Sequence, residues 1–233
     1  MLDQQIQALL DRSQAYGWVL EHHAKQILAG TGMAVPQSGL AVSASEAADI
    51  AKKIGYPVVA KIVSPAVLHK TEVDGVTLDI RTDEQLESVF RRYARHEAFS
   101  GMLIEQMLGG IELIVGGTVD AQFGPVVLLG IGGTGVEIYR DTALRMAPIK
   151  EKDVASMVNC LTGGSMLYGF RGALGIDMQA LTGLMISFSD FFVKWASQIA
   201  SIDLNPVICS SEGCTVADAR MMLMSKNHIK SNT

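Results

Sequence analysis

The spacing of apolar residues changes near residue 100, and this change constrains the fold more than any other feature of the sequence. Before residue 100, segments with helical spacing alternate with apolar runs typical of buried strands. After residue 100, short strands follow one another closely. The pattern predicts a mixed α/β to α+β fold with two lobes of sheet and helix. The predicted helices are 17–30, 43–53, 82–97, 150–161 and 177–195, and the predicted strands are 35–42, 56–63, 73–80, 101–107, 111–119, 124–129, 136–138, 143–148, 200–208 and 214–220.

The division between the lobes falls near residues 100–110. We expect an N-terminal lobe over 1–105, a C-terminal lobe over 106–222 and a tail over 223–233. The helix over 43–53 begins with a capping-box pattern, Ser43 followed by Glu46, and ends at Gly55. The helix over 17–30 closes on glycines at positions 30 and 32, which are typical of helix ends.

Composition excludes several classes of protein. The 233 residues are 48% hydrophobic and 18% charged, as in globular proteins. The net charge of -5 has no cluster of Lys and Arg with which to bind nucleic acid. The N-terminus lacks the apolar core of a signal peptide, and the longest apolar runs are too short to cross a membrane. The three cysteines lack metal-site spacing and indicate a reducing compartment, for which the cytoplasm is the default.

A lysine interrupts the apolar strand YPVVAKIV over residues 56–63. Both faces of this strand are apolar around Lys61, and a buried ammonium is costly unless it meets an anion. Lys61 therefore either extends to solvent from an exposed strand end or binds an anion, and phosphate is the favoured interpretation.

The loop that follows, SPAVLHKTEVDGV over residues 64–76, places His69 next to Lys70. By itself the loop is typical of a solvated turn. With Lys61 close in sequence, a cationic pocket for phosphate becomes an equally good interpretation. His69 adds a neutral ring nitrogen that is nucleophilic near neutral pH and can take up a phosphoryl group.

The C-terminal hairpin can be aligned residue by residue. If its turn centres on residues 211–212, Asn205 faces Asp218, and Asp203 faces Arg220. Residues two apart share one face of a strand, so Asp203, Asn205 and Asp218 should project together. Oxygen ligands without Cys or His suit Mg²⁺. The alternative is a polar, exposed face of the hairpin.

The same alignment brings the two cysteines of the hairpin together. Cys209 faces Cys214, and a disulfide between them is possible. A reduced pair is favoured, because the chain is expected in a reducing compartment.

Two carboxylates border an apolar segment further along the chain. Glu105 and Gln106 end a strand before Met107, and Glu112 lies within an apolar strand. These carboxylates either hold the amino and ribose hydroxyl groups of a nucleotide or are ordinary strand-end charges. The sequence GIGGTG over 130–135 matches a dinucleotide-binding pattern, but strand-like alternation follows where that pattern needs a helix. It indicates a Gly-rich turn beside the active site instead.

Taken together, these motifs resemble the ATP-grasp domain of nucleoside-diphosphate-forming acyl-CoA synthetases, typified by the β subunit of ADP-forming acetate–CoA ligase. The resemblance covers roughly residues 15–222, and succinyl-CoA synthetase β subunits are more distant relatives. It implies an ATP-grasp fold with nucleotide bound between the two lobes, the smaller ATP-grasp subdomain coming from within the N-terminal lobe. The motifs that carry it, in order, are residues 56–76, GIELIVG (110–116), QFGPVV (122–127), GGTGVEI (132–138), ALRMAP (143–148), FRG (170–172), IDLNPV (202–207) and VADAR (216–220).

The resemblance also implies residue roles. Lys61 and Lys70 contact nucleotide phosphates, and Glu112 holds the ribose. The adenine slot is lined by Glu105, Gln106 and Met107. Asp203, Asn205 and Asp218 bind Mg²⁺. His69 matches a histidine that takes part in phosphoryl relay.

The family's main phosphohistidine lies in a separate CoA-binding α domain, which we do not find in this sequence. The chain is therefore expected to be a β subunit, or an excised domain, that works with an α partner in an α2β2 heterotetramer. The implied reaction is acyl-CoA + ADP + phosphate ⇌ carboxylate + CoA + ATP, through phosphohistidine. One departure is Asp74, where the family usually has glycine; Asp tolerates unusual backbone angles better than most residues.

A second function class stays open at this point. Related ATP-grasp domains are fused to protein lysine acetyltransferases, where the ligase activity can be lost. The chain would then be a nucleotide-sensing or interaction module. His69, Lys70 and the predicted Mg²⁺ ligands favour the ligase, whereas Asp74 mildly favours the module.

Overall fold

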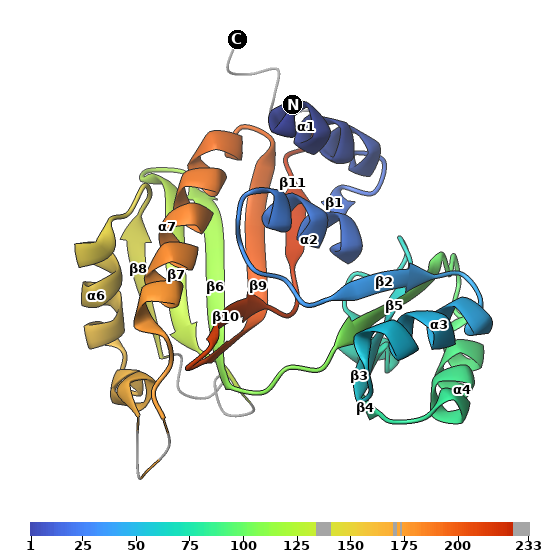
Figure 1. Cartoon of the computed structure of the whole chain (residues 1–233). Helices are drawn as coiled ribbons and strands as arrows, with labels where there is room; N and C mark the ends of the chain where they lie inside the picture. The colour runs from blue at the N-terminus through green and yellow to red at the C-terminus, as the bar shows by residue number, and fades with distance from the viewer. Residues whose placement is uncertain (134–140, 170–171, 173, 226–233) are drawn as a thin grey trace. The chain divides into compact units, whose positions relative to one another are not determined.

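A computed structural model describes residues 1–133, 141–169, 172 and 174–225 (Figure 1). The chain divides into two compact units. Unit 1 comprises Met1–Val35 and Gly109–Thr233, and unit 2 comprises Pro36–Leu108. The chain thus enters unit 2 once and returns, and each unit has its own hydrophobic core.

Unit 2 is an antiparallel sheet covered on one face by two helices. The strand order is β2-β5-β3-β4, and every neighbouring pair is antiparallel. Side chains of α3 and α4, among them Ala47 and Leu86, are buried against Ala60 and Ile62 of β3. The elements are β2 (Ser38–Ala41), α3 (Ala44–Ile54), β3 (Val58–Val63), a 3-10 helix (Lys70–Val73), β4 (Val76–Ile80), α4 (Asp83–Tyr93) and β5 (Gly101–Gln106).

Both helices of unit 2 begin with a side-chain cap. The Ser43 hydroxyl accepts a hydrogen bond from the Glu46 amide, and the Glu46 carboxylate accepts one from the amide of residue 42. Thr82 caps α4 in the same way through the Gln85 amide. Gly55 ends α3 with φ 93°, a backbone angle that favours glycine. The predicted start and end of α3 are therefore confirmed.

Unit 1 is built around a longer antiparallel sheet. The strand order is β1-β11-β9-β6-β7-β8, and β10 also pairs with β9. The strands are β1 (Trp18–Val19), β6 (Ile111–Asp120), β7 (Gly124–Ile131), β8 (Thr142–Met146), β9 (Ile199–Ser210), β10 (Gly213–Val216) and β11 (Arg220–Leu223). The helices are α1 (Leu2–Ser13), α2 (Glu21–Gly30), α6 (Glu151–Cys160), a 3-10 helix (Gly164–Tyr168) and α7 (Met178–Trp195).

The core of unit 1 lies where α7 crosses the sheet (Figure 1). Phe188 and Phe192 of α7 are fully buried and stack with their ring centroids 6.3 Å apart. A Cβ at position 117 on β6 would lie 2.9 Å from the Phe192 ring, so Gly117 lets the helix approach the sheet closely. Burial of these large side chains accounts for the helical period of α7.

Several sequence expectations need adjustment. The helix expected from residue 17 begins at Glu21, because residues 18–19 form β1, which pairs with β11. This pairing brings residues 1–35 into unit 1, whereas the predicted N-terminal lobe ran from 1 to 105. The N-terminal residues form α1, a helix that is not among the predicted ones. The short strand expected over 136–138 lies outside the described residues.

The C-terminal hairpin has the predicted register where its strands pair, although the predicted pair of Asn205 and Asp218 is not part of the ladder, because Asp218 lies between β10 and β11. Cys209 pairs with Cys214, Val207 with Val216 and Asp203 with Arg220. The two cysteines form a disulfide, whereas the sequence favoured a reduced pair. Direct opposition on adjacent strands brings their side chains within bonding reach.

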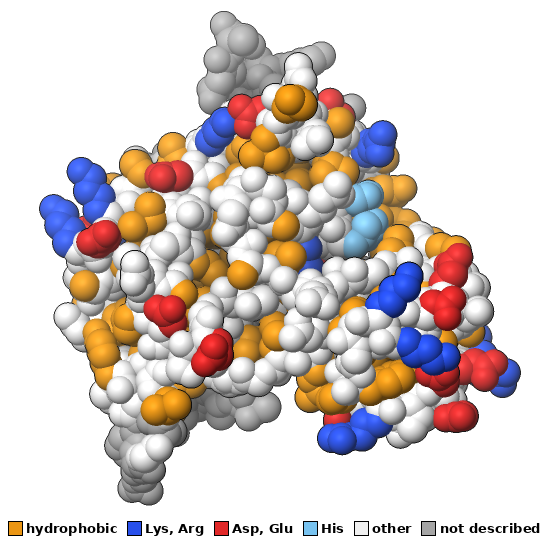
Figure 2. Space-filling model, viewed as in Figure 1, with side chains coloured by type: hydrophobic (Ala, Val, Ile, Leu, Met, Phe, Trp, Pro, Cys, Tyr) orange, Lys and Arg blue, Asp and Glu red, His pale blue; other side chains and the backbone are white. Residues whose placement is uncertain are grey.

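Surface charge is mixed rather than concentrated. Figure 2 shows Lys, Arg, Asp and Glu side chains interspersed, without a large basic patch on the described atoms of this face. Within the described ranges, no helix is both long enough and apolar enough to cross a membrane.

Candidate functional site

Lys61 lies on the face of the unit 2 sheet that the two helices do not cover. Successive strand residues point to opposite faces, so Lys61 lies opposite to the core residues Ala60 and Ile62. The side chain is buried, and its Nζ lies 2.9 Å from Glu105 Oε2. The antiparallel register places Glu105 opposite Val59, one diagonal step from Lys61. The strand lysine is therefore not extended to solvent; it meets the carboxylate of Glu105.

The loop between β3 and β4 is anchored at both ends. At its start, the buried Ser64 hydroxyl donates to the Glu97 carbonyl and accepts from the Ala66 amide. At its end, Gly75 donates its amide to the Lys70 carbonyl at 2.7 Å and accepts from the Ile62 amide at 2.8 Å. A Cβ at position 75 would lie 2.5 Å from the Ile62 side chain, so only glycine allows this closure.

His69 and Lys70 lie at the middle of this anchored loop. His69 is exposed and immediately precedes the 3-10 helix, of which Lys70 is the first residue. Asp74 ends that helix in the left-handed conformation, with φ 50°. Asp occupies this region more readily than most residues other than glycine and asparagine. Asp74 therefore fits the turn and places a carboxylate five residues from His69 in the sequence.

The remaining predicted residues of unit 2 follow at the end of β5. The Gln106 amide donates to the Gln37 carbonyl at 2.9 Å, which continues the pairing of β5 with β2. The Gln106 side chain is exposed and Met107 is partly exposed, while Glu105 is buried. Exposure therefore increases along the three residues, from the buried carboxylate of Glu105 to the accessible side chains of Gln106 and Met107.

In unit 1, β9 carries two of the three predicted Mg²⁺ ligands, Asp203 and Asn205. Ile202 and Leu204 are buried in the core, so Asp203 and Asn205 project from the opposite face. Asp218 lies in the connection from β10 to β11, and its amide donates to the Pro206 carbonyl at 3.3 Å. Asn205 is exposed, and Asp203 and Asp218 are half-buried.

The electrostatics of Asp203 fit a cation. Burial raises the pKa of the Asp203 carboxyl, Arg220 lowers it, and the Asp218 carboxylate raises it again. A carboxyl in these surroundings gains from a nearby positive charge, which would favour its ionised form. Among the described residues, no group of three or more His, Cys, Asp and Glu side chains is placed to hold a metal ion. The candidate donors are two carboxylates and one amide oxygen, a set that Mg²⁺ accepts.

Arg220 is a residue of this cluster to which the sequence reading gave no role. Its Nη2 donates to Asp203 Oδ2 at 3.1 Å. The predicted pairing of positions 203 and 220 was the signal that could have identified it. The arginine thus contacts one oxygen of Asp203, and Asn205 is the exposed member of the three predicted ligands.

Glu112 is exposed on β6 rather than enclosed by apolar side chains. Its carbonyl accepts a hydrogen bond from the Gly132 amide at 2.6 Å, at the end of β7. A Cβ at position 132 would lie 2.8 Å from that carbonyl oxygen, so glycine is needed for the close approach. The rest of the predicted Gly-rich turn, from residue 134 on, lies outside the described residues.

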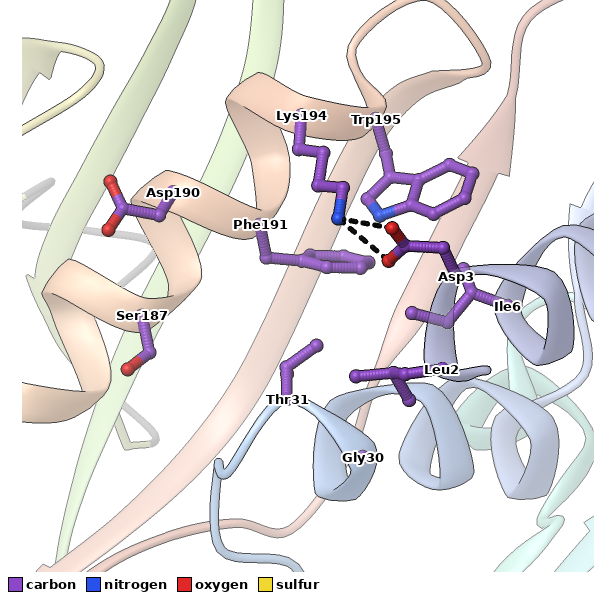
Figure 3. A pocket seen from close by; sticks show the side chains of 10 residues that line it. All are labelled: Leu2, Asp3, Ile6, Gly30, Thr31, Ser187, Asp190, Phe191, Lys194 and Trp195. Atoms are coloured by element: carbon purple, nitrogen blue, oxygen red, sulfur yellow. Dashed lines mark hydrogen bonds and ion pairs between the residues drawn. The ribbon is translucent and has the colours of Figure 1, made fainter.

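Unit 1 also contains a pocket of about 400 Å³ that no predicted site residue lines (Figure 3). It lies among α1, the end of α2 and α7. Phe191 and Trp195 supply apolar surface, and Lys194 Nζ binds both carboxylate oxygens of Asp3 at 2.7 Å. The ion pair satisfies both charges within the protein.

Comparison with known proteins gives a consistent result. A family model described as an ATP-grasp domain matches residues 11–223. The chain is 37% identical over 215 residues to the β subunit of ADP-forming acetate–CoA ligase II from Pyrococcus furiosus, covering 88% of this chain and 91% of the relative.

Solved structures give the same result. Acetyl-coenzyme A synthetase 1 of Ca. Korarchaeum cryptofilum, in complex with coenzyme A and Ca-AMPCP, superposes with a TM-score of 0.87 at 37% identity. The match covers 93% of this chain and 99% of that one. A second structure of that enzyme holds coenzyme A and Mg-AMPPCP, with a phosphohistidine segment pointing towards the nucleotide-binding site. It superposes with a TM-score of 0.82 at 37% identity, covering 94% of this chain and all of that one.

Proposed function

Since the chain belongs to the ATP-grasp family of ADP-forming acetate–CoA ligase β subunits, we propose that it is the nucleotide-handling subunit of an ADP-forming acyl-CoA synthetase. The observation that carries this proposal is the identity of 37% to a β subunit over almost the full length of both chains. The retained His69–Lys70 pair and the Asp203, Asn205 and Asp218 cluster support activity rather than a sensing module.

The proposed reaction transfers a phosphoryl group in steps. Phosphate displaces CoA from acyl-CoA, giving an acyl phosphate and free CoA. A histidine of the partner subunit attacks the acyl phosphate and releases the carboxylate. The phosphoryl group then passes to the terminal oxygen of ADP, giving ATP and free histidine. Covalent intermediates of this kind divide one difficult transfer into easier steps.

His69 is proposed to receive the phosphoryl group near the nucleotide. Its ring is exposed, so an incoming phosphohistidine can reach it, and the anchored loop limits its freedom of movement. A neutral imidazole nitrogen attacks phosphorus, and the P–N bond to the partner's histidine breaks as the new bond forms. The terminal oxygen of ADP then attacks the phosphoryl group on His69. The P–N bond to His69 breaks, and neutral His69 is regenerated.

Nucleotide binding in unit 2 is assigned to the lysines and to the end of β5. Lys70 would neutralise phosphate charge from the loop, while Glu105 holds Lys61 in place. Charge-assisted hydrogen bonds from lysine to phosphate are among the stronger polar contacts in proteins. Glu105, Gln106 and Met107 are proposed to line the adenine slot, and Glu112 of unit 1 to hold the ribose.

Asp203, Asn205 and Asp218 would hold Mg²⁺. When bound, the metal would neutralise charge on the nucleotide phosphates during transfer. Asp218 and Asn205 would supply oxygen ligands, and Arg220 would keep Asp203 ionised. The Korarchaeum structure with Mg-AMPPCP supports a magnesium–nucleotide substrate for this chain.

The proposal includes a partner chain. A CoA-binding α subunit with its own catalytic histidine would supply the acyl phosphate, in an α2β2 assembly in the cytoplasm. The name of the Pyrococcus relative, a β subunit, supports a partner. Acyl selection would then lie in that partner.

Calorimetry tests the nucleotide assignment without the partner. ADP titrated into the chain should bind more tightly with Mg²⁺ than with EDTA, and Asp218→Asn should remove most of that difference. Lys70→Met should weaken ADP binding in both buffers. Lys152→Met, a change at an exposed lysine of α6, is the matched control and should bind as the wild type does. Equal ADP affinity with and without Mg²⁺ would favour the sensing or interaction module.

A further inference from the structure

Helix α2 contains a buried ion pair that the nucleotide and metal assignments do not use. Glu21 and Lys25 are one helical turn apart, each is 3% exposed, and Lys25 Nζ lies 2.9 Å from Glu21 Oε1. An ion pair at this spacing is common on exposed helix faces. In the interior, the free-energy cost of removing two charges from water offsets much of the attraction between them. A buried ion pair is therefore weak evidence for a gain in stability. Its burial indicates another role.

Lys25 makes a second contact that suggests this role. Its Nζ donates to the carbonyl oxygen of Ala217 at 2.6 Å, across 192 positions of sequence. Ala217 is the first residue of the connection between β10 and β11, where the ladder with β9 is interrupted. The second residue of that connection is Asp218.

The Ala217 carbonyl and the Asp218 amide belong to one peptide group. Lys25 binds the carbonyl end of this group, and the Pro206 carbonyl accepts its amide at 3.3 Å. A peptide group is planar, so contacts at both ends fix its orientation and with it the position of the Asp218 Cα, from which the side chain extends. Pro206 also accepts the Ala217 amide at 3.0 Å and directly follows Asn205. Two of the proposed Mg²⁺ ligands, Asn205 and Asp218, are thus linked through the Pro206 carbonyl.

We propose that Lys25, with Glu21 as its counter-ion, is a positioning residue that orients Asp218 for Mg²⁺–nucleotide binding. This inference rests on the metal role proposed for Asp218. Glu21 neutralises and aims the ammonium, and the ammonium holds the peptide group that leads into Asp218. Groups that orient a metal ligand without touching the metal alter metal affinity by about 10- to 100-fold when they are removed.

Two variants separate positioning from stability. Lys25→Met removes the contact to Ala217 and leaves the buried Glu21 carboxylate without its Lys25 partner, so it should also lower the melting temperature. Glu21→Leu combined with Lys25→Met removes both charges, and an apolar replacement of a buried pair is often tolerated. Compared with Lys25→Met, the double variant should therefore have a higher melting temperature, close to that of the wild type. Its affinity for Mg²⁺ should be as low as that of Lys25→Met.

The test is calorimetric titration of Mg²⁺ into the full chain saturated with ADP, with thermal unfolding measured in parallel. We expect the dissociation constant for Mg²⁺ to rise about tenfold or more in both variants. ADP should also bind in EDTA, more weakly than with Mg²⁺, and the affinity of this metal-free binding should not change in either variant. A general loss of structure would lower that affinity too. The control Lys152→Met should match the wild type in all three measurements.

Two results would overturn the inference and can be told apart. A folded double variant that binds Mg²⁺ as tightly as the wild type would show that the buried pair does not position Asp218. An Asp218→Asn variant with wild-type Mg²⁺ affinity would remove the metal role of Asp218 itself, and the positioning role with it. In that second case the proposed metal site fails, whatever Lys25→Met does.

Discussion

At the scale of single residues, buried charge is the most informative feature of unit 2. Lys61 and Glu105 have side chains that are 7% and 2% exposed, and they lie 2.9 Å apart. Lys61→Met would leave the Glu105 carboxylate buried without this partner. We expect the free energy of unfolding to fall by about 3–5 kcal/mol, the cost of breaking a buried pair from one side. Denaturation by guanidinium chloride measures this change.

An exposed ion pair of the same unit provides the control. Arg91 and Glu87 of α4 are paired at 2.6 Å, with 71% and 50% of their side chains exposed. Arg91→Met should lower the free energy of unfolding by no more than about 0.5 kcal/mol. If Lys61→Met costs as little as Arg91→Met, Lys61 is accessible to solvent and the buried pairing with Glu105 is wrong.

Two histidines of α2 should make stability depend on pH. Burial and the neighbouring charge of His23 lower the pKa of His22 to about 4, although Glu21 acts in the opposite direction. Burial and Arg12 lower the pKa of His23. The folded chain thus favours the neutral rings. The stability that they contribute is complete above the unfolded pKa of 6.5 and is lost as pH falls towards 4.

Replacing His22 should reduce that pH dependence. Between pH 6.5 and about 4, His22→Gln should lose about 1–2 kcal/mol less unfolding free energy than the wild type does. This difference is smaller than the full pKa shift implies, because the ring is only partly buried. Urea denaturation across this range measures the difference. Parallel curves for the two proteins would mean that His22 keeps an ordinary pKa in the folded chain.

At the scale of elements, helix caps offer a direct check on the local structure of unit 2. Ser43 accepts the Glu46 amide at 3.2 Å, and its replacement by alanine leaves that amide without its cap. Ser43→Ala should cost about 1 kcal/mol of unfolding free energy. Ser88→Ala, at an exposed position inside α4, should be neutral or slightly stabilising, because alanine is the better helix former there. Equal effects of the two changes on urea denaturation would contradict the cap.

Local signals were enough to predict much of the element structure. The cap at Ser43, the glycine end at Gly55 and the period of α7 follow from neighbouring residues, and the structure confirms them. The hairpin register also followed from its turn, since one fixed turn determines every later pair. Asp203 opposite Arg220 is therefore a prediction that local sequence can support.

Contacts between distant segments were not predictable in the same way. Residues 18–19 were predicted to belong to a helix. Their neighbours in the sequence carry no signal of the pairing with β11, which lies about two hundred residues later. The Lys61–Glu105 ion pair depends on the register between β3 and β5, which is set by the whole sheet. The contact from Lys25 to Ala217 likewise joins segments 192 positions apart.

At the scale of the whole molecule, the chain forms two compact units, to which the proposed function gives different tasks. Unit 2 carries the anchored loop with His69 and Lys70, and unit 1 carries the acidic cluster of Asp203, Asn205 and Asp218. The proposed function divides the reaction between this chain, which would handle nucleotide, and a partner, which would handle the acyl group; the β-subunit name of the Pyrococcus relative supports that division.

The most direct test of this account is ATP formation from acetyl-CoA, ADP and phosphate by the chain mixed with its CoA-binding partner. We predict that ATP forms with Mg²⁺ and both chains present and not with either chain alone. His69→Ala should lower the rate by orders of magnitude without preventing Mg²⁺-dependent ADP binding. A mixture that binds ADP but forms no ATP would contradict the ligase assignment, and an unchanged rate in His69→Ala would contradict the role of His69.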